Sequence, residues 1–207
     1  MEGRACLGKR CGLRFGVAMN SILDSSEVRE ALAPMSVEFY QSASDLGWFG
    51  EDVELLEGFP VKKRSKSPLH ENLVEELLER IRSCLHGDRW VSKERPIQCA
   101  ISQPEPDIAV FAGPRDFRAT THPTTAEFVI EVAVNTLEKD LRKAAIYAAA
   151  DVAEYWVVDP KTCSILVHRQ PIGEGYAEIT PFGSGQVVPS SRINGFVIRV
   201  DELLQPV

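Results

Sequence analysis

The chain has 207 residues and a formal net charge of −7, and 44% of its residues are hydrophobic and 26% charged. A chain of this length and composition can build one domain, or one domain with a tail, around a full hydrophobic core. Its acidity argues against a protein that coats nucleic acid non-specifically, and no apolar run approaches the roughly 20 residues that a membrane span needs.

The N-terminal region differs from the rest of the chain. Residues 1–34 show no clear hydrophobic period, and no uninterrupted apolar core follows their basic residues, so the sequence predicts no secretory signal. We expect a poorly ordered N-terminal extension over 1–34 and one folded domain over 36–207.

The cysteines indicate a reducing compartment. They are odd in number, form no CxxC pair and lie at positions 6, 11, 84, 99 and 163. We interpret them as reduced thiols of a cytoplasmic protein. A zinc site built from Cys6, Cys11 and a histidine would have a spacing that matches known zinc motifs poorly.

Two short elements are predicted at the start of the folded domain. A helix over 36–47 has Ser36 as a candidate N-cap and Gly47 as its stop. "VELLEGFPV", residues 53–61, is typical of a hairpin that turns at Glu57-Gly58. The basic run that follows, at positions 62, 63, 64 and 66, indicates either a solvated loop or a phosphate contact beside an active site.

The strongest predicted helix covers residues 68–86. Ser67 can cap it, Pro68 occupies its first position, and Gly87 ends it. Apolar residues recur at helical spacing along one face, at positions 69, 73, 77, 81 and 85.

The C-terminal half predicts strands around one further helix. Strand-like runs occupy 95–100, 106–111, 128–134, 154–159, 164–169, 176–180 and 195–200, and an alanine-rich helix covers 137–150. The turn after the strand at 154–159 has Asp and Pro at the positions that a type I turn favours. A polar loop over 112–126 separates the second and third strands.

A carboxylate lies at the centre of an apolar strand, since Glu131 stands within "FVIEVAV" (128–134). An ionised carboxylate buried alone would cost several kcal/mol, so the pattern predicts that a cation compensates its charge. Asp107 opens the strand over 106–111. If these two strands are neighbours, both carboxylates can face the same side and hold Mg²⁺, which prefers carboxylate ligands and keeps several waters.

The following helix offers a positive charge. Asp140, Lys143 and Tyr147 fall on one helical face. If this helix packs across the sheet, the ammonium of Lys143 reaches the carboxylate pair. It could then orient a water molecule or stabilise charge that develops on a phosphate oxygen.

These motifs together resemble the Uma-two family of restriction endonucleases, within the PD-(D/E)XK nuclease superfamily. The resemblance rests on "EPDIAVF", "FVIEVAV", "KDLRKAAIYAAADVAEYWVVDP" and the upstream "VELLEGFPV" and "SPLHENLVEELL", in consistent order over about 36–205. It implies a restriction-endonuclease-like nuclease domain over 36–207, an α/β (α+β-like) fold with a mixed central sheet of about four core strands flanked by α-helices. It also implies a phosphodiesterase site that depends on Mg²⁺, for which Mn²⁺ can substitute.

The resemblance assigns roles to particular residues. Asp107 and Glu131 match the metal-binding acids, and Lys143 matches the lysine that this family carries on the helix, because Ala133 stands where the wider superfamily has it. His70 matches the histidine that opens the first long helix. The residues assigned auxiliary roles are His70, Glu71, Glu75, Asp140 and Tyr147.

Two departures from the family pattern concern the helix over 137–150. Asp140 stands three rather than four residues before Lys143, which puts the role of Asp140 in doubt. Asp151 replaces the usual glycine after the helix, but aspartate tolerates a left-handed cap better than most residues.

Two functions follow from these patterns. The first is a Mg²⁺-dependent endonuclease that hydrolyses phosphodiester bonds of nucleic acid, with DNA as the expected substrate. The second is a catalytically inactive nuclease-fold module that binds protein or nucleic acid. The acidic net charge favours this second function, as does the absence of the superfamily lysine from position 133, where the chain has Ala133. Nucleases that cut duplexes often dimerise to reach both strands, so a homodimer is a candidate assembly, although no residue identifies an interface. No membrane partner is expected.

Overall fold

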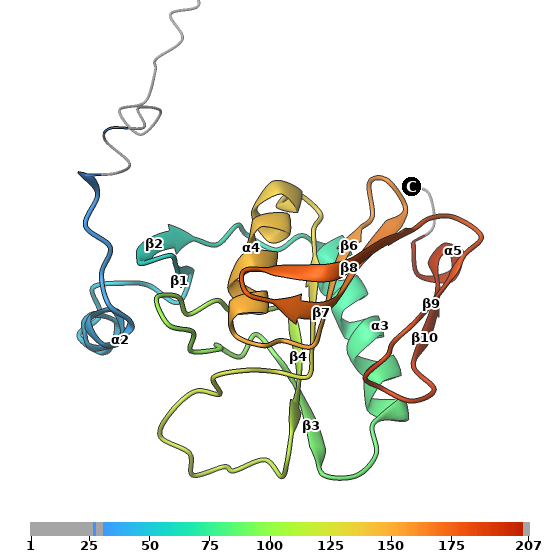
Figure 1. The fold of residues 1–207 in the computed structure, drawn as a ribbon, viewed down its shortest axis with the longest axis horizontal. Coiled ribbons are helices and arrows are strands. Elements are labelled where there is room, and N and C mark those ends of the chain that lie inside the picture. Colours follow the sequence, from blue (N-terminus) through green and yellow to red (C-terminus); the bar gives the residue numbers. More distant parts are fainter. Residues whose placement is uncertain (1–26, 28–30, 205–207) are drawn as a thin grey trace, which may run out of the picture. The chain divides into compact units, whose positions relative to one another are not determined.

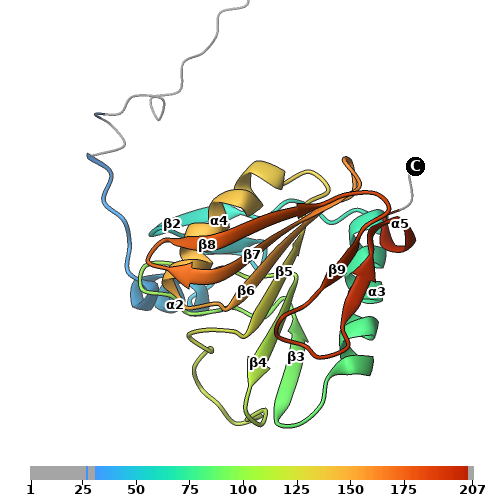
Figure 2. The same cartoon turned by 45° about the vertical axis from the view of Figure 1, so that its right-hand side comes forward.

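The centre of the fold is a mixed sheet of six strands in the spatial order β3-β4-β5-β6-β7-β8 (Figure 1; Figure 2). Its strands are β3 (Arg89–Lys93), β4 (Ile108–Ala112), β5 (Phe128–Val132), β6 (Glu154–Asp159), β7 (Ser164–Ile172) and β8 (Gly175–Phe182). Neighbouring strands are antiparallel except β5 and β6, which run parallel. Helix α4 (Leu137–Ala149) makes the crossover that a parallel pair requires.

This computed structural model describes residue 27 and residues 31–204, and the fold is that of the unit from Pro34 onward. The N-terminal extension expected over 1–34 falls almost entirely outside the described residues and stays a prediction; Cys6 and Cys11 also lie outside them. The described cysteines are free thiols, at positions 84, 99 and 163. Within the described ranges, every helix is too short or too polar to cross a bilayer.

Two helices cover opposite faces of the sheet (Figure 2). Helix α3 (Pro68–Cys84) contributes a stripe of leucine, valine and isoleucine to one core, which also includes Ile130 and Trp156. Helix α4 lies on the other face, in a core with Val129 and Tyr155. The strands alternate their side chains between these two cores, as the pleat requires. The implied mixed sheet flanked by helices is therefore confirmed, although it has six strands rather than about four.

Both predicted N-caps are present. The Ser36 hydroxyl accepts from Phe39 N at 3.2 Å at the start of α2 (Val37–Asp45). The Ser67 hydroxyl accepts from His70 N, also at 3.2 Å, at the start of α3, with Pro68 at the first helical position. These bonds satisfy backbone donors that the first turn of a helix leaves free.

The hairpin predicted near residue 57 is also present. It joins β1 (Val53–Leu56) to β2 (Phe59–Lys62), and Glu57 and Gly58 both have positive φ, of 51° and 80°. Two such residues make the two-residue turn that matches the twist of the flanking strands.

One predicted strand is wrong. Residues 95–100 form no strand, and the edge strand is β3, which ends at Lys93 before this segment begins. Pro96 cannot donate to a ladder, and Ile97 N instead donates to the carbonyl of Pro104 at 3.0 Å. The segment is still buried at Ile97, so its apolar residues serve the core without joining the sheet.

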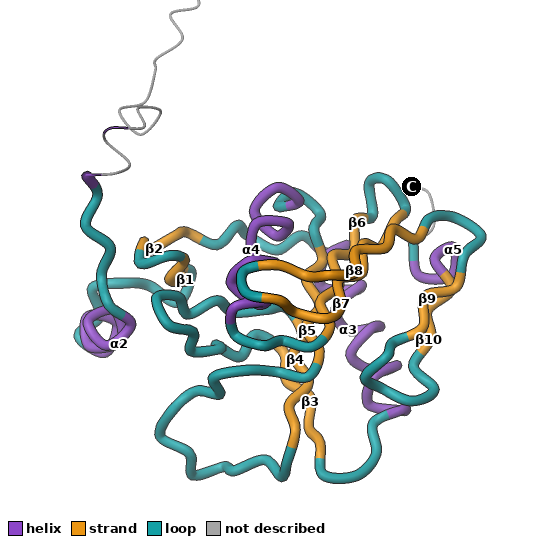
Figure 3. Tube along the Cα trace, in the orientation of Figure 1, coloured by secondary structure: helices purple, strands orange, loops and turns teal. Residues whose placement is uncertain are grey.

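The remaining elements complete the face that α3 covers. Strands β9 (Val187–Pro189) and β10 (Val197–Arg199) form a small antiparallel pair, followed by α5 (Val200–Leu203). The sequence did not predict β9, and the strand expected over 195–200 is shorter because α5 begins at its last residue. The predicted polar loop between β4 and β5 is visible as a long connection in Figure 3.

Candidate active site

The strand register brings the two predicted acids side by side. Ile108 pairs with Ile130 in the antiparallel β4–β5 ladder, so Asp107 lies opposite Glu131. Asp107 N donates to Glu131 Oε2 at 3.4 Å, and Val132 N donates to Asp107 Oδ2 at 2.8 Å. Both acids lie on the face of the sheet that α4 covers, because each is two residues from a member of that core.

Helix α4 supplies the cation that the buried acid requires. Lys143 Nζ lies 2.9 Å from Glu131 Oε1, and the Tyr147 hydroxyl donates to the same oxygen at 2.8 Å. Lys143 is only 3% exposed. The ammonium of Lys143 therefore compensates the carboxylate that lies within β5, and Asp107, Glu131 and Lys143 lie close together as predicted.

A third buried acid joins this group, and the sequence analysis missed it. Glu54 on β1 is fully buried, and its Oε2 lies 2.9 Å from Lys143 Nζ. Its Oε1 accepts from Lys139 at 2.8 Å. The signal was the one used for Glu131, since Glu54 is a carboxylate inside the apolar run "VELL".

His70 meets the first acid from the other side of the site. Its Nε2 lies 3.0 Å from Asp107 Oδ2, while its backbone N–H makes the capping bond to Ser67. The N-cap of α3 thus holds the backbone of His70, and Asp107 holds its ring. The ring can orient the Asp107 carboxylate, which also accepts from Val132 N.

Asp140 lies at the site but does not bond to Lys143. Its carboxylate is buried and accepts from the Thr136 hydroxyl, one turn earlier in the chain. Burial raises the pKa of Asp140, although the nearby Lys143 opposes this shift.

The other two acids assigned auxiliary roles lie elsewhere. Glu71 and Glu75 are both exposed on α3, and neither lines the site. Glu75 instead forms a surface ion pair with Lys93, at 2.7 Å. The metal or water contact expected from these two residues is therefore not supported by their positions, because the inward face of α3 is occupied by its apolar stripe.

Burial and close charges shift the pKa values within this group. Burial raises the pKa of Glu131 to about 8, with Lys143 acting against the shift. Burial alone would lower the pKa of Lys143, but Glu131 and Glu54 outweigh it and keep the pKa above its ordinary value. Burial likewise acts to raise the pKa of Glu54, and Lys143 and Lys139 reverse the direction. Such opposed shifts cluster at functional sites.

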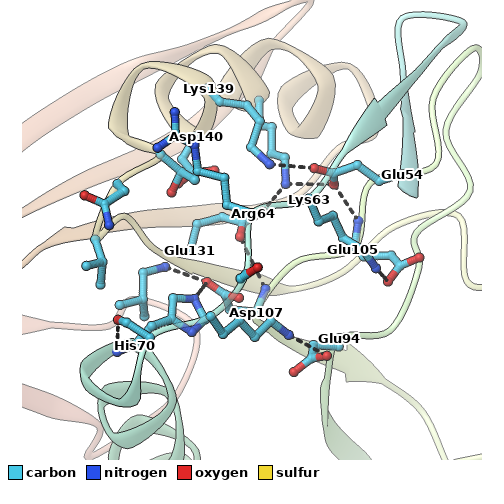
Figure 4. A pocket seen from close by; sticks show the side chains of 18 residues that line it. Glu54, Lys63, Arg64, His70, Glu94, Glu105, Asp107, Glu131, Lys139 and Asp140 are labelled. Carbon is cyan, nitrogen blue, oxygen red and sulfur yellow. Dashed lines mark hydrogen bonds and ion pairs between the residues drawn. The ribbon is translucent and has the colours of Figure 1, made fainter. Parts of the chain in front are cut away.

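A pocket opens over these residues (Figure 4). Its inner wall contains Asp107, Glu131 and Lys143, and the segment between β2 and α3 passes along its rim. The basic run singled out in the sequence contributes Lys63, Arg64 and Lys66 to the lining. Figure 4 shows Lys63 and Arg64 near the acids.

The two facing acids fit a hard divalent cation by their chemistry. Asp107 Oδ1 makes no hydrogen bond to a described residue, and Glu131 Oε2 has only the long contact to Asp107 N. Mg²⁺ is commonly bound by one or two carboxylates together with water and substrate phosphate. Among the described residues, no group of three His, Cys, Asp or Glu side chains is arranged to hold a metal.

Comparison with known families identifies the chain. A family model described as "Putative restriction endonuclease", named Uma2, matches residues 40–201. The chain belongs to the Uma2 family. The match includes both facing acids. Asp151, after α4, has a positive φ of 55°, the left-handed conformation expected for it.

A solved structure supports the fold of this Uma2 chain. A crystal structure from Anabaena variabilis ATCC 29413, titled as a putative nuclease belonging to DUF820, is similar with a TM-score of 0.65. It is 18% identical, and the match covers 78% of this chain and 96% of that one. Among curated proteins, none matches this chain in sequence.

Proposed function

We propose that the protein is a Mg²⁺-dependent endonuclease that hydrolyses phosphodiester bonds of nucleic acid, with DNA as the expected substrate. The observation that carries the proposal is the meeting of Asp107, Glu131 and Lys143 in one pocket. Membership of a family described as restriction endonucleases supports it. Two acids that can hold a metal ion and a lysine beside them are the groups that phosphodiester hydrolysis requires.

Each residue has a distinct role in this proposal. Asp107 and Glu131 would hold Mg²⁺, which neutralises charge on the scissile phosphate and makes a bound water a stronger nucleophile when it is present. Lys143 orients the attacking water or stabilises charge that grows on a phosphate oxygen. Tyr147 and Glu54 fix the positions of Glu131 and Lys143, since each donates to or accepts from one of them.

The test is cleavage of DNA and RNA by purified protein in Mg²⁺ or Mn²⁺. We expect Asp107→Asn and Glu131→Gln each to lower the rate by about a hundredfold or more, because each removes one charge from the proposed metal site. Glu75→Gln is the matched control, since Glu75 is an exposed acid that does not line the pocket. Equal rates in wild type, Asp107→Asn and Glu131→Gln would refute the assignment.

A non-catalytic module is the second candidate, and two contacts favour it. Lys143 and Tyr147 both donate to Oε1 of Glu131, and the ammonium of Lys143 compensates its charge. Titration calorimetry with Mn²⁺ separates the two candidates. Heat of binding in the wild type that disappears in Asp107→Asn favours the nuclease, and no heat in either favours the module.

A further inference from the structure

The segment between β2 and α3 forms the rim of the pocket. Residues 63–67 have no regular secondary structure and include three basic residues, Lys63, Arg64 and Lys66. Three consecutive members of the segment, Arg64, Ser65 and Lys66, line the pocket and are exposed. The rim is therefore in a position to meet a ligand before that ligand reaches the buried acids.

The cations around this pocket differ in whether a carboxylate already holds them. Each lysine has a partner, in the pairs Lys63–Glu105 (2.6 Å), Lys66–Glu94 (2.5 Å), Lys139–Glu54 (2.8 Å) and Lys143–Glu131 (2.9 Å). Arg64 makes no ion pair and no side-chain hydrogen bond within residues 31–204. Arg64 is thus a pocket-lining guanidinium whose charge no described carboxylate neutralises.

We propose that Arg64, together with the hydroxyl of Ser65, binds a backbone phosphate of the nucleic acid next to the phosphate that is cut. This inference rests on the proposed function and adds a substrate contact to the same site. A guanidinium presents parallel N–H donors that match two phosphate oxygens, which a lysine ammonium cannot do.

Position within the pocket decides which phosphate Arg64 meets. Lys143 is almost fully buried beside the acids, where the reacting phosphate has to lie. Arg64 is exposed at the rim. A phosphate at the rim is therefore a neighbour along the strand, and it fixes the position of the backbone without taking part in the chemistry.

The spacing of charges along a nucleic acid also fits this lining, which mixes carboxylates with cations. The pocket lining is rich in carboxylates, with Glu94 and Glu105 on the rim beside the deeper acids. A second acidic protein surface would meet these carboxylates at close range. A nucleic acid backbone instead alternates charged phosphates with neutral sugars, so one phosphate can reach Arg64 while the next reaches a metal held by Asp107 and Glu131.

The first experiment measures binding of a short fluorescein-labelled DNA duplex by anisotropy, with Ca²⁺ in place of Mg²⁺ and a gel to confirm that the DNA is intact. We expect Arg64→Ala to weaken binding about tenfold and to reduce the salt dependence by about one phosphate contact. Lys62→Ala is the matched control, because Lys62 is a neighbouring cation that pairs with Asp52 and does not line the pocket. Its affinity should equal that of the wild type.

The second experiment identifies the phosphate. A neutral methylphosphonate is placed beside the mapped cleavage position, which should weaken wild-type binding by the same factor as Arg64→Ala. In the Arg64→Ala variant the methylphosphonate should weaken binding no further, because both changes remove the same contact between Arg64 and this phosphate. Fully additive losses would overturn the inference.

The outcomes separate the inference from the proposed function. If the wild type binds and cuts DNA but Arg64→Ala matches it in affinity and salt dependence, the Arg64 contact is wrong and the nuclease stands. If the wild type neither binds nor cuts DNA or RNA, the proposed function is wrong and the Arg64 contact is wrong with it.

Discussion

Two buried carboxylates in neighbouring parallel strands differ in how fully hydrogen bonds satisfy their oxygens. Glu154 opens β6 and Glu131 lies within β5, and both are almost inaccessible to solvent. Glu154 accepts from the guanidinium of Arg169 at 3.0 Å, from the indole of Trp156 at 2.7 Å and from Ser191 N at 2.7 Å. Glu131 accepts from Lys143 and Tyr147 at one oxygen, while its other oxygen has only a contact of 3.4 Å.

The difference shows that a buried acid is not by itself a functional signal. The contacts of Glu154 with Arg169 and Ser191 connect β6 to other parts of the fold, since Arg169 lies on β7 and Ser191 in the connection between β9 and β10. Glu131 instead borders a pocket and shares its partner Lys143 with a second acid, Glu54. The partners and the remaining free oxygen distinguish an acid that stabilises the fold from one that can bind a ligand.

The largest effect is expected from removing Glu154, the acid that stabilises the fold. Glu154→Ala should lower the free energy of unfolding by about 3–5 kcal/mol, because Arg169 and the backbone N–H of Ser191 would lose their buried partner. Urea unfolding measures this loss, and the exposed Glu174→Ala is the control. A loss under about 1 kcal/mol would mean that Glu154 has no greater structural role than a surface acid.

The next prediction concerns the lysine of the candidate site. Lys143→Met should lower cleavage about a hundredfold or more, since it removes the charge beside the reacting phosphate. The variant should still fold, because Lys143 opposes the rise that burial causes in the pKa of Glu131, so losing the lysine raises this pKa further and keeps the carboxyl neutral. Single-turnover cleavage and circular dichroism test both statements. Arg142→Met, at an exposed position of α4, should leave the rate unchanged.

A smaller effect is expected at Glu54. Glu54→Gln keeps the shape of the side chain but removes the second anchor of Lys143 and the partner of Lys139. We expect cleavage to fall about tenfold, less than in Lys143→Met, with a stability loss of about 1–3 kcal/mol. The two losses are read from the rate at saturating metal and from urea unfolding. An unchanged rate would show that Glu131 alone positions Lys143.

The smallest prediction uses a buried histidine away from the site. Burial lowers the pKa of His168, so the folded state keeps this ring neutral where the unfolded chain binds a proton. Stability from this residue is present above the ordinary histidine pKa of about 6.5 and is lost as the pH falls below it. The midpoint of thermal unfolding should therefore fall less between neutral and mildly acidic pH in His168→Gln than in the wild type. Identical pH dependence would contradict this role.

The sequence predicted most of the fold because its local signals were consistent. Both serine caps, the turn at Glu57-Gly58 and the apolar stripe of α3 agree with the structure. Residues 95–100 were mistaken for a strand because an apolar run can serve a core without pairing in a sheet. Strand β9 is three residues long, too short for a periodic pattern.

The candidate site was predictable only where spacing along the chain implied proximity. Adjacent antiparallel strands brought Asp107 opposite Glu131, and helical spacing brought Lys143 toward them. The ion pair between Lys143 and Glu54 joins residues that are far apart in sequence, and a single sequence contains no signal for that distance. Glu71 was expected at the site but does not line it, because its position in the first turn of α3 does not reveal which residues of that turn face the pocket.

The inward face of α4 has a consequence for motion. Its buried residues are Asp140, Lys143, Tyr147 and Ala148, and three of these have polar side chains, whereas Leu141 is partly exposed. Hydrogen bonds and opposite charges therefore contribute to the attachment of this helix, beside the apolar contacts of Tyr147 and Ala144. Any event that redistributes charge among Glu54, Glu131 and their lysine should also change how often α4 opens locally, so that amide hydrogen exchange along this helix would report the state of the site.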